Sequence, residues 1–332
     1  MKELGAISSE LRAISPTLRV LSPGIKATVQ DQGRQGIRHH GLARGGVLDL
    51  RSAAWANKLL DNERNAACVE IVLGGFQAEA LSACEVSVTG ARADVTVNGK
   101  PVGMWQSLQL APGDKLAIGH SRNHRLIYLA VRGGFKTREW FGSHSVVERE
   151  ALEGAGPLQA GDLLPAGSHE PIQGAPRIAP PQAWQWLEQS PVLGLIPGYQ
   201  HHQFRSADLR RLVTSQYQVS DDSDRMGYRL AGSPMADPPP GIVSEGIIPG
   251  AVQIPGDGQP IALLADCQTI GGYPKPGVIA SLDCGLLAQQ LPGSEITFEW
   301  TDTLTAQNRR RLFERQYQQT VWSENGRSPH WR

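Results

Sequence analysis

The stretch CEVSVTGARADVTVNGKPV, residues 84–102, alternates apolar and polar residues on either side of turns that contain glycine. This alternation puts apolar side chains on one face of an extended chain, which is typical of half-buried β-strands. The run LIYLAV, residues 126–131, is apolar throughout and is followed by Gly133–Gly134, so it fits a strand buried on both faces. We therefore predict a mainly β protein with few, short helices.

Two segments nevertheless predict helices. The segment LDLRSAAWANKLLDN, residues 48–62, has Asp49 in an N-cap position and small or apolar residues along one face. The segment TLTAQNRRRLFERQYQQTVW, residues 303–322, predicts a C-terminal helix. Its expected apolar stripe consists of Leu304, Leu312, Phe313 and Tyr317.

The composition excludes several classes of protein. Lys+Arg and Asp+Glu number 32 each in 332 residues, and a net charge of zero gives no basic surplus for a nucleic-acid partner. No run of about 18 apolar residues occurs, so we expect no membrane partner. The N-terminal residues lack the apolar core of a signal peptide, which favours a cytoplasmic protein.

The chain is long enough for about two domains. We expect a flexible N-terminus at 1–17 and an N-terminal β-rich domain at 18–165. The proline-rich residues 166–190 predict a linker, because proline disfavours regular structure and stiffens the chain. A second β-rich domain at 191–300 and a C-terminal helix and tail at 301–332 complete the prediction.

Four stretches are too polar and too rich in glycine to be strands alone: ATVQDQGRQGIRHHG (27–41), ARGGVLDL (43–50), SDDSDRMGYRL (220–230) and ADCQTIGGYPKPG (265–277). They supply carboxylates, guanidinium groups and amides, and arginine in particular offers a donor fork that suits a carboxylate or phosphate. Their glycines allow the main chain to approach a ligand closely. Taken singly, each residue also fits a structural role as a turn former or an ion-pair partner.

Cofactor motifs are absent from the sequence. There is no G-x-x-x-x-G-K-[ST] loop, no G-x-G-x-x-G unit after a strand and no biotin-acceptor Met-Lys-Met. We therefore expect this chain alone to bind no cofactor, so that any ATP or biotin is supplied by another chain. The four cysteines form no C-x-x-C pair and the histidines show no ligand spacing, so we expect no metal site.

Several quoted motifs occur together in one order: TVQDQGRQGIRHHG, GGVLDLRSAAWANKLLDN, SDRMGYRL, SEGIIPGAVQIPGDGQPI and LLADCQTIGGYP. In this the chain resembles the biotin-dependent carboxyltransferase-related family, also called allophanate hydrolase subunit 2, over about residues 18–298. That family includes the C subunit of 5-oxoprolinase and the KipA-type proteins. The resemblance implies a cyclophilin-like β-barrel architecture with two β-rich lobes.

The resemblance also implies a function. We expect the C subunit of a heteromeric ATP-dependent 5-oxoprolinase, inactive alone, which hydrolyses the lactam 5-oxo-L-proline to L-glutamate. The expected partners are a subunit-1 or KipI-like protein and a LamB/YcsF-like subunit, with ATP bound through these partners. One alternative is the carboxyltransferase half of a biotin-dependent urea or amide carboxylase, with biotin on a separate carrier. Another is a KipA-type regulatory protein that binds a KipI-like kinase inhibitor.

Candidate site residues follow from the same motifs. Those expected to act chemically are Asp266, Gln268 and Glu245. Those expected to bind substrate are Asp31, Arg34, Asp49, Arg225, Gln253, Thr269, Gly271, Gly272, Tyr273 and Lys275. Arg225 or Lys275 would hold an anionic group, Asp266 or Glu245 would transfer a proton, and N–H groups near Gly271 would stabilise negative charge on a carbonyl oxygen. We expect these groups from both lobes to converge at one concave rim.

The sequence departs from the family pattern in one region. After GSHSVV, residues 142–147, family members usually carry a Gly-Gly pair and an arginine, whereas this chain continues EREALEGAGPLQAGD. Arg132 also stands where a small residue is common. These differences leave open a different substrate.

Overall fold

The computed structural model describes residues 16–170, 172, 174–323 and 326. Residues 1–15 of the predicted flexible N-terminus and most of the predicted C-terminal tail beyond 323 lie outside this part of the chain. The described residues divide into two compact units. The first comprises those up to Arg34, Gly45–Trp186 and those from Tyr317 onward, and the second comprises Gln35–Arg44 and Leu187–Gln316.

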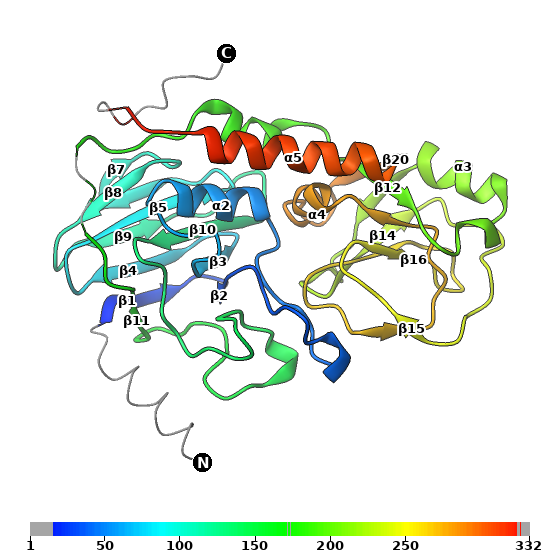
Figure 1. The fold of residues 1–332 in the computed structure, drawn as a ribbon, viewed down its shortest axis with the longest axis horizontal. Helices are drawn as coiled ribbons and strands as arrows, with labels where there is room; N and C mark the ends of the chain where they lie inside the picture. Colours follow the sequence, from blue (N-terminus) through cyan, green and yellow to red (C-terminus); the bar gives the residue numbers. More distant parts are fainter. Residues whose placement is uncertain (1–15, 171, 173, 324–325, 327–332) are drawn as a thin grey trace. The chain divides into compact units, whose positions relative to one another are not determined.

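The first unit is built from two antiparallel sheets, which Figure 1 shows in blue to green. One sheet has the strand order β11-β1-β4-β9-β6-β7 and the other β2-β3-β10-β5-β8. The strands of the first sheet are β1 (Pro16–Pro23), β4 (Phe76–Ala80), β6 (Val95–Val97), β7 (Lys100–Val102), β9 (Lys115–Ile118) and β11 (Leu163–Pro165). Those of the second are β2 (Lys26–Gln30), β3 (Cys68–Val72), β5 (Cys84–Gly90), β8 (Ser107–Leu110) and β10 (Leu126–Val131).

A single hydrophobic core joins the two sheets. Phe76 and Ala78 from one sheet and Val86, Ile71 and Leu129 from the other belong to the same buried cluster. Every residue of β10 is buried, which confirms the strand predicted to be covered on both faces. Its outer face is covered by α2 (Leu50–Lys58), which contacts β5 and β10 (Figure 1).

Helix α2 begins as the sequence predicts. Asp49 is its N-cap, and its carboxylate accepts hydrogen bonds from the main-chain N–H groups of Arg51 and Ser52. Buried hydroxyls of β5 fix the helix on the sheet: Ser87 donates to Ala56 O at 2.7 Å, and Thr89 donates to a carbonyl in the first turn at 2.8 Å.

The proline-rich stretch after β11 runs along the first unit. Ser107 N donates to Arg177 O at 2.9 Å and Ala179 N donates to Trp105 O at 2.8 Å, so main-chain bonds hold this stretch against β8. Short 3-10 turns follow at η3 (Pro181–Ala183) and at η4 (Gln185–Glu188), where the first unit ends, and another turn, η2 (Glu148–Glu150), precedes β11.

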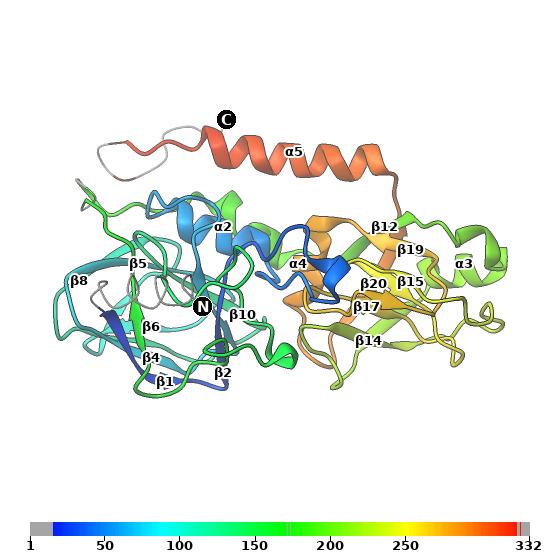
Figure 2. The same cartoon turned by 60° about the horizontal axis from the view of Figure 1, so that its bottom comes forward.

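The second unit is a closed seven-stranded barrel in the order β12-β19-β16-β17-β14-β13-β20, which closes through a parallel pairing of β12 with β20 (Figure 2). The strands are β12 (Val192–Pro197), β13 (Gln216–Val219), β14 (Gly227–Gly232), β16 (Ala251–Gln253), β17 (Ile261–Leu263), β19 (Gly277–Ile279) and β20 (Glu295–Trp300). Alternate residues, such as Tyr228 and Leu230 around exposed Arg229, are buried. The predictions of a mainly β fold and a barrel are confirmed.

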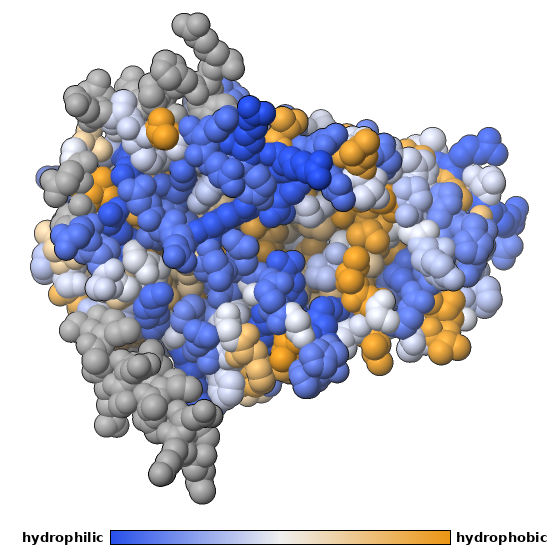
Figure 3. All heavy atoms as spheres, viewed as in Figure 1, coloured by the Kyte–Doolittle hydropathy of each residue, from blue (hydrophilic) through white to orange (hydrophobic). Residues whose placement is uncertain are grey.

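A short ribbon of β15 (Glu245–Gly246) and β18 (Ile270–Gly271) adds to the barrel unit. Ile247, which follows β15, and Cys267, which precedes β18 by three residues, form a small buried cluster with Ala251 and Leu263 of the barrel strands. Around the same ribbon, large apolar side chains are exposed to solvent: Val243, Ile248, Ile270 and Tyr273. Figure 3 shows apolar side chains on the surface of this unit.

The second unit contains the helices α3 (Ser206–Thr214) and α4 (Ser281–Ala288) and most of α5 (Thr303–Gln319), with the 3-10 turns η1 (Arg38–His40) and η5 (His201–Gln203). The buried carboxylate of Asp283 in α4 accepts a hydrogen bond from Gly194 N of β12 at 2.9 Å. It also accepts hydrogen bonds from both terminal nitrogens of Arg309, at 2.9 and 2.6 Å. Because Arg309 belongs to α5 (Thr303–Gln319), this carboxylate fixes three elements of the barrel unit.

The predicted C-terminal helix exists as α5, but its predicted apolar stripe is partly wrong. Phe313 and Tyr317 are each 8% exposed, whereas Leu304 and Leu312 are 63% and 59% exposed. Leu304 lies nine residues before Phe313, which at 3.6 residues per turn places the two on opposite sides of the helix. None of the helices within the described residues combines the length and apolar character that a membrane crossing demands.

Candidate functional site

Asp31 ties together two loops of the first unit. It follows β2 and is only 3% exposed. Its Oδ1 accepts hydrogen bonds from Gly33 N at 2.7 Å, Ser143 Oγ at 2.6 Å and Ser145 Oγ at 2.5 Å, and its Oδ2 accepts one from His144 N at 2.8 Å. Four donors compensate the buried charge, as burial of a carboxylate requires. The part of Asp31 in substrate binding stays a prediction.

Arg34 and Asp49 are likewise held by partners in the first unit. Arg34 is 2% exposed as a residue, and its guanidinium group forms an ion pair with Glu150 at the end of η2. Asp49, which is fully buried, caps α2 through Arg51 N at 3.0 Å and Ser52 N at 3.1 Å. Both residues therefore stabilise the local fold, and direct contact with a substrate stays a prediction for each.

A buried polar network that the sequence analysis missed surrounds the start of α2. Tyr128 on β10 donates to Glu70 Oε2 on β3 at 2.7 Å and accepts from Asp49 N at 2.8 Å. Leu48 N donates to the same Glu70 oxygen at 2.8 Å. Burial first, and then the nearby charges of Glu70 and Asp49, raise the pKa of Tyr128 well above its ordinary value, so its hydroxyl remains a donor. Both residues lie in apolar strands, where the sequence pattern gives no functional signal.

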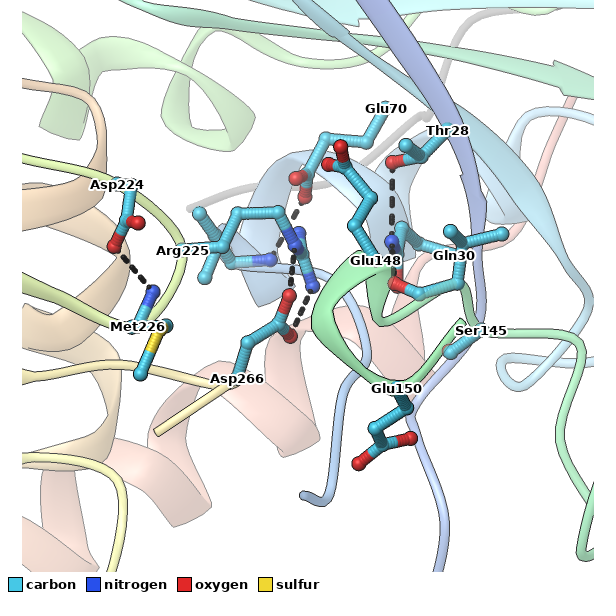
Figure 4. Close-up of polar contacts among 12 residues, drawn as sticks. Thr28, Gln30, Glu70, Ser145, Glu148, Glu150, Asp224, Arg225, Met226 and Asp266 are labelled. Carbon is cyan, nitrogen blue, oxygen red and sulfur yellow. Dashed lines mark hydrogen bonds and ion pairs between the residues drawn. The ribbon is translucent and has the colours of Figure 1, made fainter. Parts of the chain in front are cut away.

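Arg225 and Asp266 form a two-pronged ion pair in the second unit. Arg225 Nε donates to Asp266 Oδ2 and Nη2 donates to Oδ1, each at 2.9 Å, as Figure 4 shows. The two side chains are 11% and 7% exposed. Just before Arg225, Asp224 Oδ1 accepts Met226 N at 2.8 Å and so fixes the turn that leads into β14. Because both oxygens of Asp266 face the guanidinium group, its clearest role is to orient Arg225.

Glu245 and Lys275 form a second charged pair. Lys275 Nζ lies 2.7 Å from Glu245 Oε1, and Gln200 Nε2 donates to the same oxygen at 2.7 Å. Hydrogen bonds first from Lys275 and then from Gln200 hold the pKa of Glu245 below its ordinary value. Among the described residues, no partner contacts Oε2 of Glu245. Gln200 is a residue that the sequence analysis did not select.

Gln253 at the end of β16 is 2% exposed, yet its buried Nε2 has no hydrogen-bond partner among the described residues. Unsatisfied buried amides are rare and require an explanation such as a water or a ligand. A Cβ at Gly271 would lie 2.7 Å from this nitrogen, so only glycine leaves the amide its present position. Gly271 also pairs with Glu245 across the β15–β18 ribbon. The ribbon therefore places Gln253 and Glu245 next to one glycine.

The other candidates on this ribbon contribute mainly main-chain groups. Thr269 O accepts a hydrogen bond from the chain after β15 at 3.0 Å, and Gly272 O accepts one from the chain before it at 2.8 Å. Tyr273 O accepts from the ammonium group of Lys275 at 3.3 Å. Gln268 O accepts from Arg38 Nη2 at 2.9 Å, and Arg38 was not selected from the sequence.

The candidates thus fall into separate local groups. Glu245, Gln253, Gly271 and Lys275 form one group around β15 and β18, and Arg225 with Asp266 forms another. The single rim expected from the sequence stays a prediction. Within the described residues, no three His, Cys, Asp or Glu side chains come together as a metal site would require.

Comparison with known proteins supports a family assignment. The 5-oxoprolinase C subunit of Escherichia coli is 33% identical over 301 residues, which cover 90% of this chain and 96% of that protein. The crystal structure of TTHA0988 is 33% identical with a TM-score of 0.78, over 86% of this chain and 56% of that chain. The Kluyveromyces lactis urea carboxylase structure, at 23% identity, shares the fold with a TM-score of 0.84, over 92% of this chain and 30% of that chain.

The family model that describes the carboxyltransferase domain, subdomain A and B, matches residues 40–300. This match covers most of both β-rich units, from the turn η1 to the last barrel strand. The chain therefore belongs to the carboxyltransferase domain, subdomain A and B, family.

Proposed function

We propose that this chain is the C subunit of a heteromeric 5-oxoprolinase that uses ATP to hydrolyse 5-oxo-L-proline to L-glutamate. The observation that carries the proposal is the similarity to the 5-oxoprolinase C subunit of Escherichia coli over nearly the full length of both chains. In the overall reaction, one water hydrolyses ATP to ADP and phosphate. A second water adds across the lactam C–N bond, so that the carbonyl carbon gains a hydroxyl group and the nitrogen gains a proton.

The group around β15 and β18 supplies the chemistry that this reaction needs. The unpaired amide of Gln253 would donate to the lactam carbonyl oxygen, where negative charge develops. Glu245 is a carboxylate near neutral pH, and its Oε2, which has no hydrogen-bond partner among the described residues, would accept a proton from the attacking water. Lys275 would hold the substrate carboxylate or keep Glu245 in place. In this scheme Asp266 acts by positioning Arg225 rather than by proton transfer.

The proposal includes partner subunits. The sequence has no phosphate-binding loop, so we assign ATP to a KipI-like or a LamB/YcsF-like partner, and this chain would be inactive alone. The exposed apolar side chains of Val243, Ile248 and Ile270 beside the ribbon are of the kind that a partner covers. ATP is a cytoplasmic metabolite, and we accordingly place the complex in the cytoplasm.

Reconstitution tests the proposal directly. This chain would be combined with its KipI-like and LamB/YcsF-like partners, and glutamate and ADP formation would be followed with 5-oxo-L-proline as substrate. We expect turnover only with all three proteins, and a loss of at least about tenfold with Gln253→Leu or Glu245→Gln, since each removes a hydrogen bond to the reacting groups. Glu295→Gln, on an exposed position of β20, is the matched control and should leave turnover unchanged.

Two negative results of the reconstitution would exclude different parts of the proposal. An assembled three-protein complex that forms no glutamate would exclude the 5-oxoprolinase assignment. Full turnover in Gln253→Leu and Glu245→Gln would keep the assignment but exclude the site around the ribbon.

Membership in a carboxyltransferase family favours a second candidate, transfer of a carboxyl group from biotin on a separate carrier to an amide such as urea. Adding a biotin carboxylase, a biotinylated carrier protein, labelled bicarbonate and urea to the same mixture distinguishes the two. Label that appears in the amide product, with no glutamate formed from 5-oxo-L-proline, would favour this candidate.

A further inference from the structure

A cavity of about 550 Å³ lies within the first unit and is lined only by residues of that unit. Three segments form it, residues 61–67, 132–144 and 167–169, together with Asp31. This volume is in the range of small-molecule binding sites. Its lining is rich in charged and polar side chains, so a polar ligand suits it better than an apolar one.

Several charged groups of the lining already have partners. Asp31 accepts the four hydrogen bonds described above. Asp61 Oδ2 is paired with Arg177 and lies 3.8 Å from Arg132. Arg132 in turn donates to Leu60 O at 2.8 Å and to Glu170 O at 2.7 Å. These groups form the wall of the cavity and leave little unpaired charge for a ligand.

Other groups in the lining have no such partners. Within the described residues, the ammonium group of Lys136 forms no hydrogen bond or ion pair, and the same holds for the carboxylates of Glu63 and Glu139. The stem of Lys136 packs on Gly167, where an added Cβ would lie 3.0 Å from Cε. One unpaired cation and two unpaired carboxylates therefore line the same cavity.

Two histidines also line the cavity and add hydrogen-bond acceptors to it. His144 Nδ1 lies 2.9 Å from Thr137 O, and His169 Nδ1 lies 2.9 Å from Gly167 O. A carbonyl oxygen only accepts hydrogen bonds, so Nδ1 carries the proton in both rings and Nε2 of the neutral ring is an acceptor. Among the described residues neither Nε2 has a partner. The cavity thus offers one cationic donor and four unpaired acceptors, two carboxylates and two imidazole nitrogens.

We propose that this cavity binds a zwitterionic amino acid, with its carboxylate on Lys136 and its ammonium group bonded to one or two of the unpaired acceptors of Glu63, Glu139, His144 and His169. A ligand with one negative group and one cationic N–H donor complements this set of charges. A polyanion such as a nucleotide phosphate is disfavoured, because both unpaired carboxylates would repel it. A metal ion is disfavoured too, since no three metal-binding side chains of the described residues come together.

Calorimetry on the full chain with the twenty proteinogenic amino acids tests this inference, and each amino acid that binds is compared with its des-amino and its decarboxylated analogue. We expect saturable binding of at least one amino acid, with both analogues weaker by at least about tenfold. Lys136→Met should weaken binding by at least about tenfold, while Lys136→Arg, which keeps the charge, should restore most of it. Lys100→Met, on exposed β7 outside the cavity, is the matched control and should change nothing.

NMR tests whether the amino acid binds inside this cavity. Ring proton signals of His144 and His169, assigned by single substitutions to glutamine, should shift with the same saturation curve, and the signal of His120, which does not line the cavity, should not. Three results would overturn the inference: no saturable binding of any amino acid up to millimolar concentration, equal affinity for a des-amino analogue, or undiminished affinity in Lys136→Met.

Discussion

The ion pair of Arg225 with Asp266 provides the sharpest test of the second unit. Two hydrogen bonds of 2.9 Å join the side chains, which are 11% and 7% exposed. We would make Arg225→Met, Asp266→Leu and the double variant. Each single substitution leaves one nearly buried charge without its main partner, whereas the double variant replaces the pair by apolar side chains of similar size.

The expected magnitudes follow from this burial. Breaking a fully buried pair by removing one partner costs about 3–5 kcal/mol of unfolding free energy. Because both side chains are slightly exposed, we expect each single variant to lose unfolding free energy at the lower end of this range, about 3 kcal/mol. The double variant should cost less than either single variant, because an apolar replacement of a buried pair is often nearly neutral. A coupling energy of at least about 2 kcal/mol between the two sites follows.

The assay must report on the second unit alone, because a chain of two compact units need not unfold in one step. Amide hydrogen exchange followed by mass spectrometry on peptides from β14 and β17 meets this need. We expect both single variants to lose protection in these strands and the double variant to regain part of it. A coupling energy below about 0.5 kcal/mol would show that the pair is not formed in solution and would refute the positioning role of Asp266.

Three further predictions concern single groups. Gly271→Ala puts a methyl group 2.7 Å from Gln253 Nε2, so turnover of the reconstituted complex should fall about tenfold or more, and unchanged turnover would argue against a catalytic role of this amide. The carboxyl ¹³C signal of Glu245 should titrate with a midpoint below the ordinary pKa of 4.5, and this midpoint should rise in Lys275→Met; an unchanged midpoint would contradict the pairing. The contribution of Glu245 to stability is present above its unfolded-state pKa and disappears as the pH falls through its folded-state pKa. Burial raises the pKa of Cys84 to about 12, so this thiol should react with a disulfide reagent at pH 8 only after unfolding, and labelling of the native chain would show that it is accessible.

Local sequence patterns predicted the elements whose signal is local. The alternation at 84–102 predicted the strands β5, β6 and β7, although every residue of β5 is buried where half-burial was expected. The apolar run at 126–131 predicted β10, which is buried throughout as expected. Asp49 caps α2 as expected, because an N-cap is decided by the few residues that follow it. The helix α5 was also predicted, but its buried side only in part. Phe313 and Tyr317 are buried as predicted, whereas Leu304 and Leu312 are exposed, because only the packing selects among the apolar residues that surround the helix.

The pairing of strands that lie far apart in the sequence had no such local signal. The parallel pairing of β12 with β20 closes the barrel between residues about a hundred positions apart, and nothing in either strand specifies that partner. The ribbon of β15 and β18 has two residues in each strand, which is too short for any periodicity to show. It nevertheless positions the candidate residues of the second unit, so the arrangement of those residues could not be derived from their spacing.

The candidate residues illustrate a more general difference between residue type and residue availability. Asp31 and Asp49 have the chemistry of ligand-binding carboxylates, yet donors of their own unit occupy them. Gln253 is less conspicuous in the sequence, but among the described residues its buried side-chain nitrogen has no hydrogen-bond partner. A buried polar group without a partner costs free energy in the folded chain unless something binds it. The groups that the fold leaves unsatisfied, rather than the most polar motifs, are therefore where a ligand gains the most from binding.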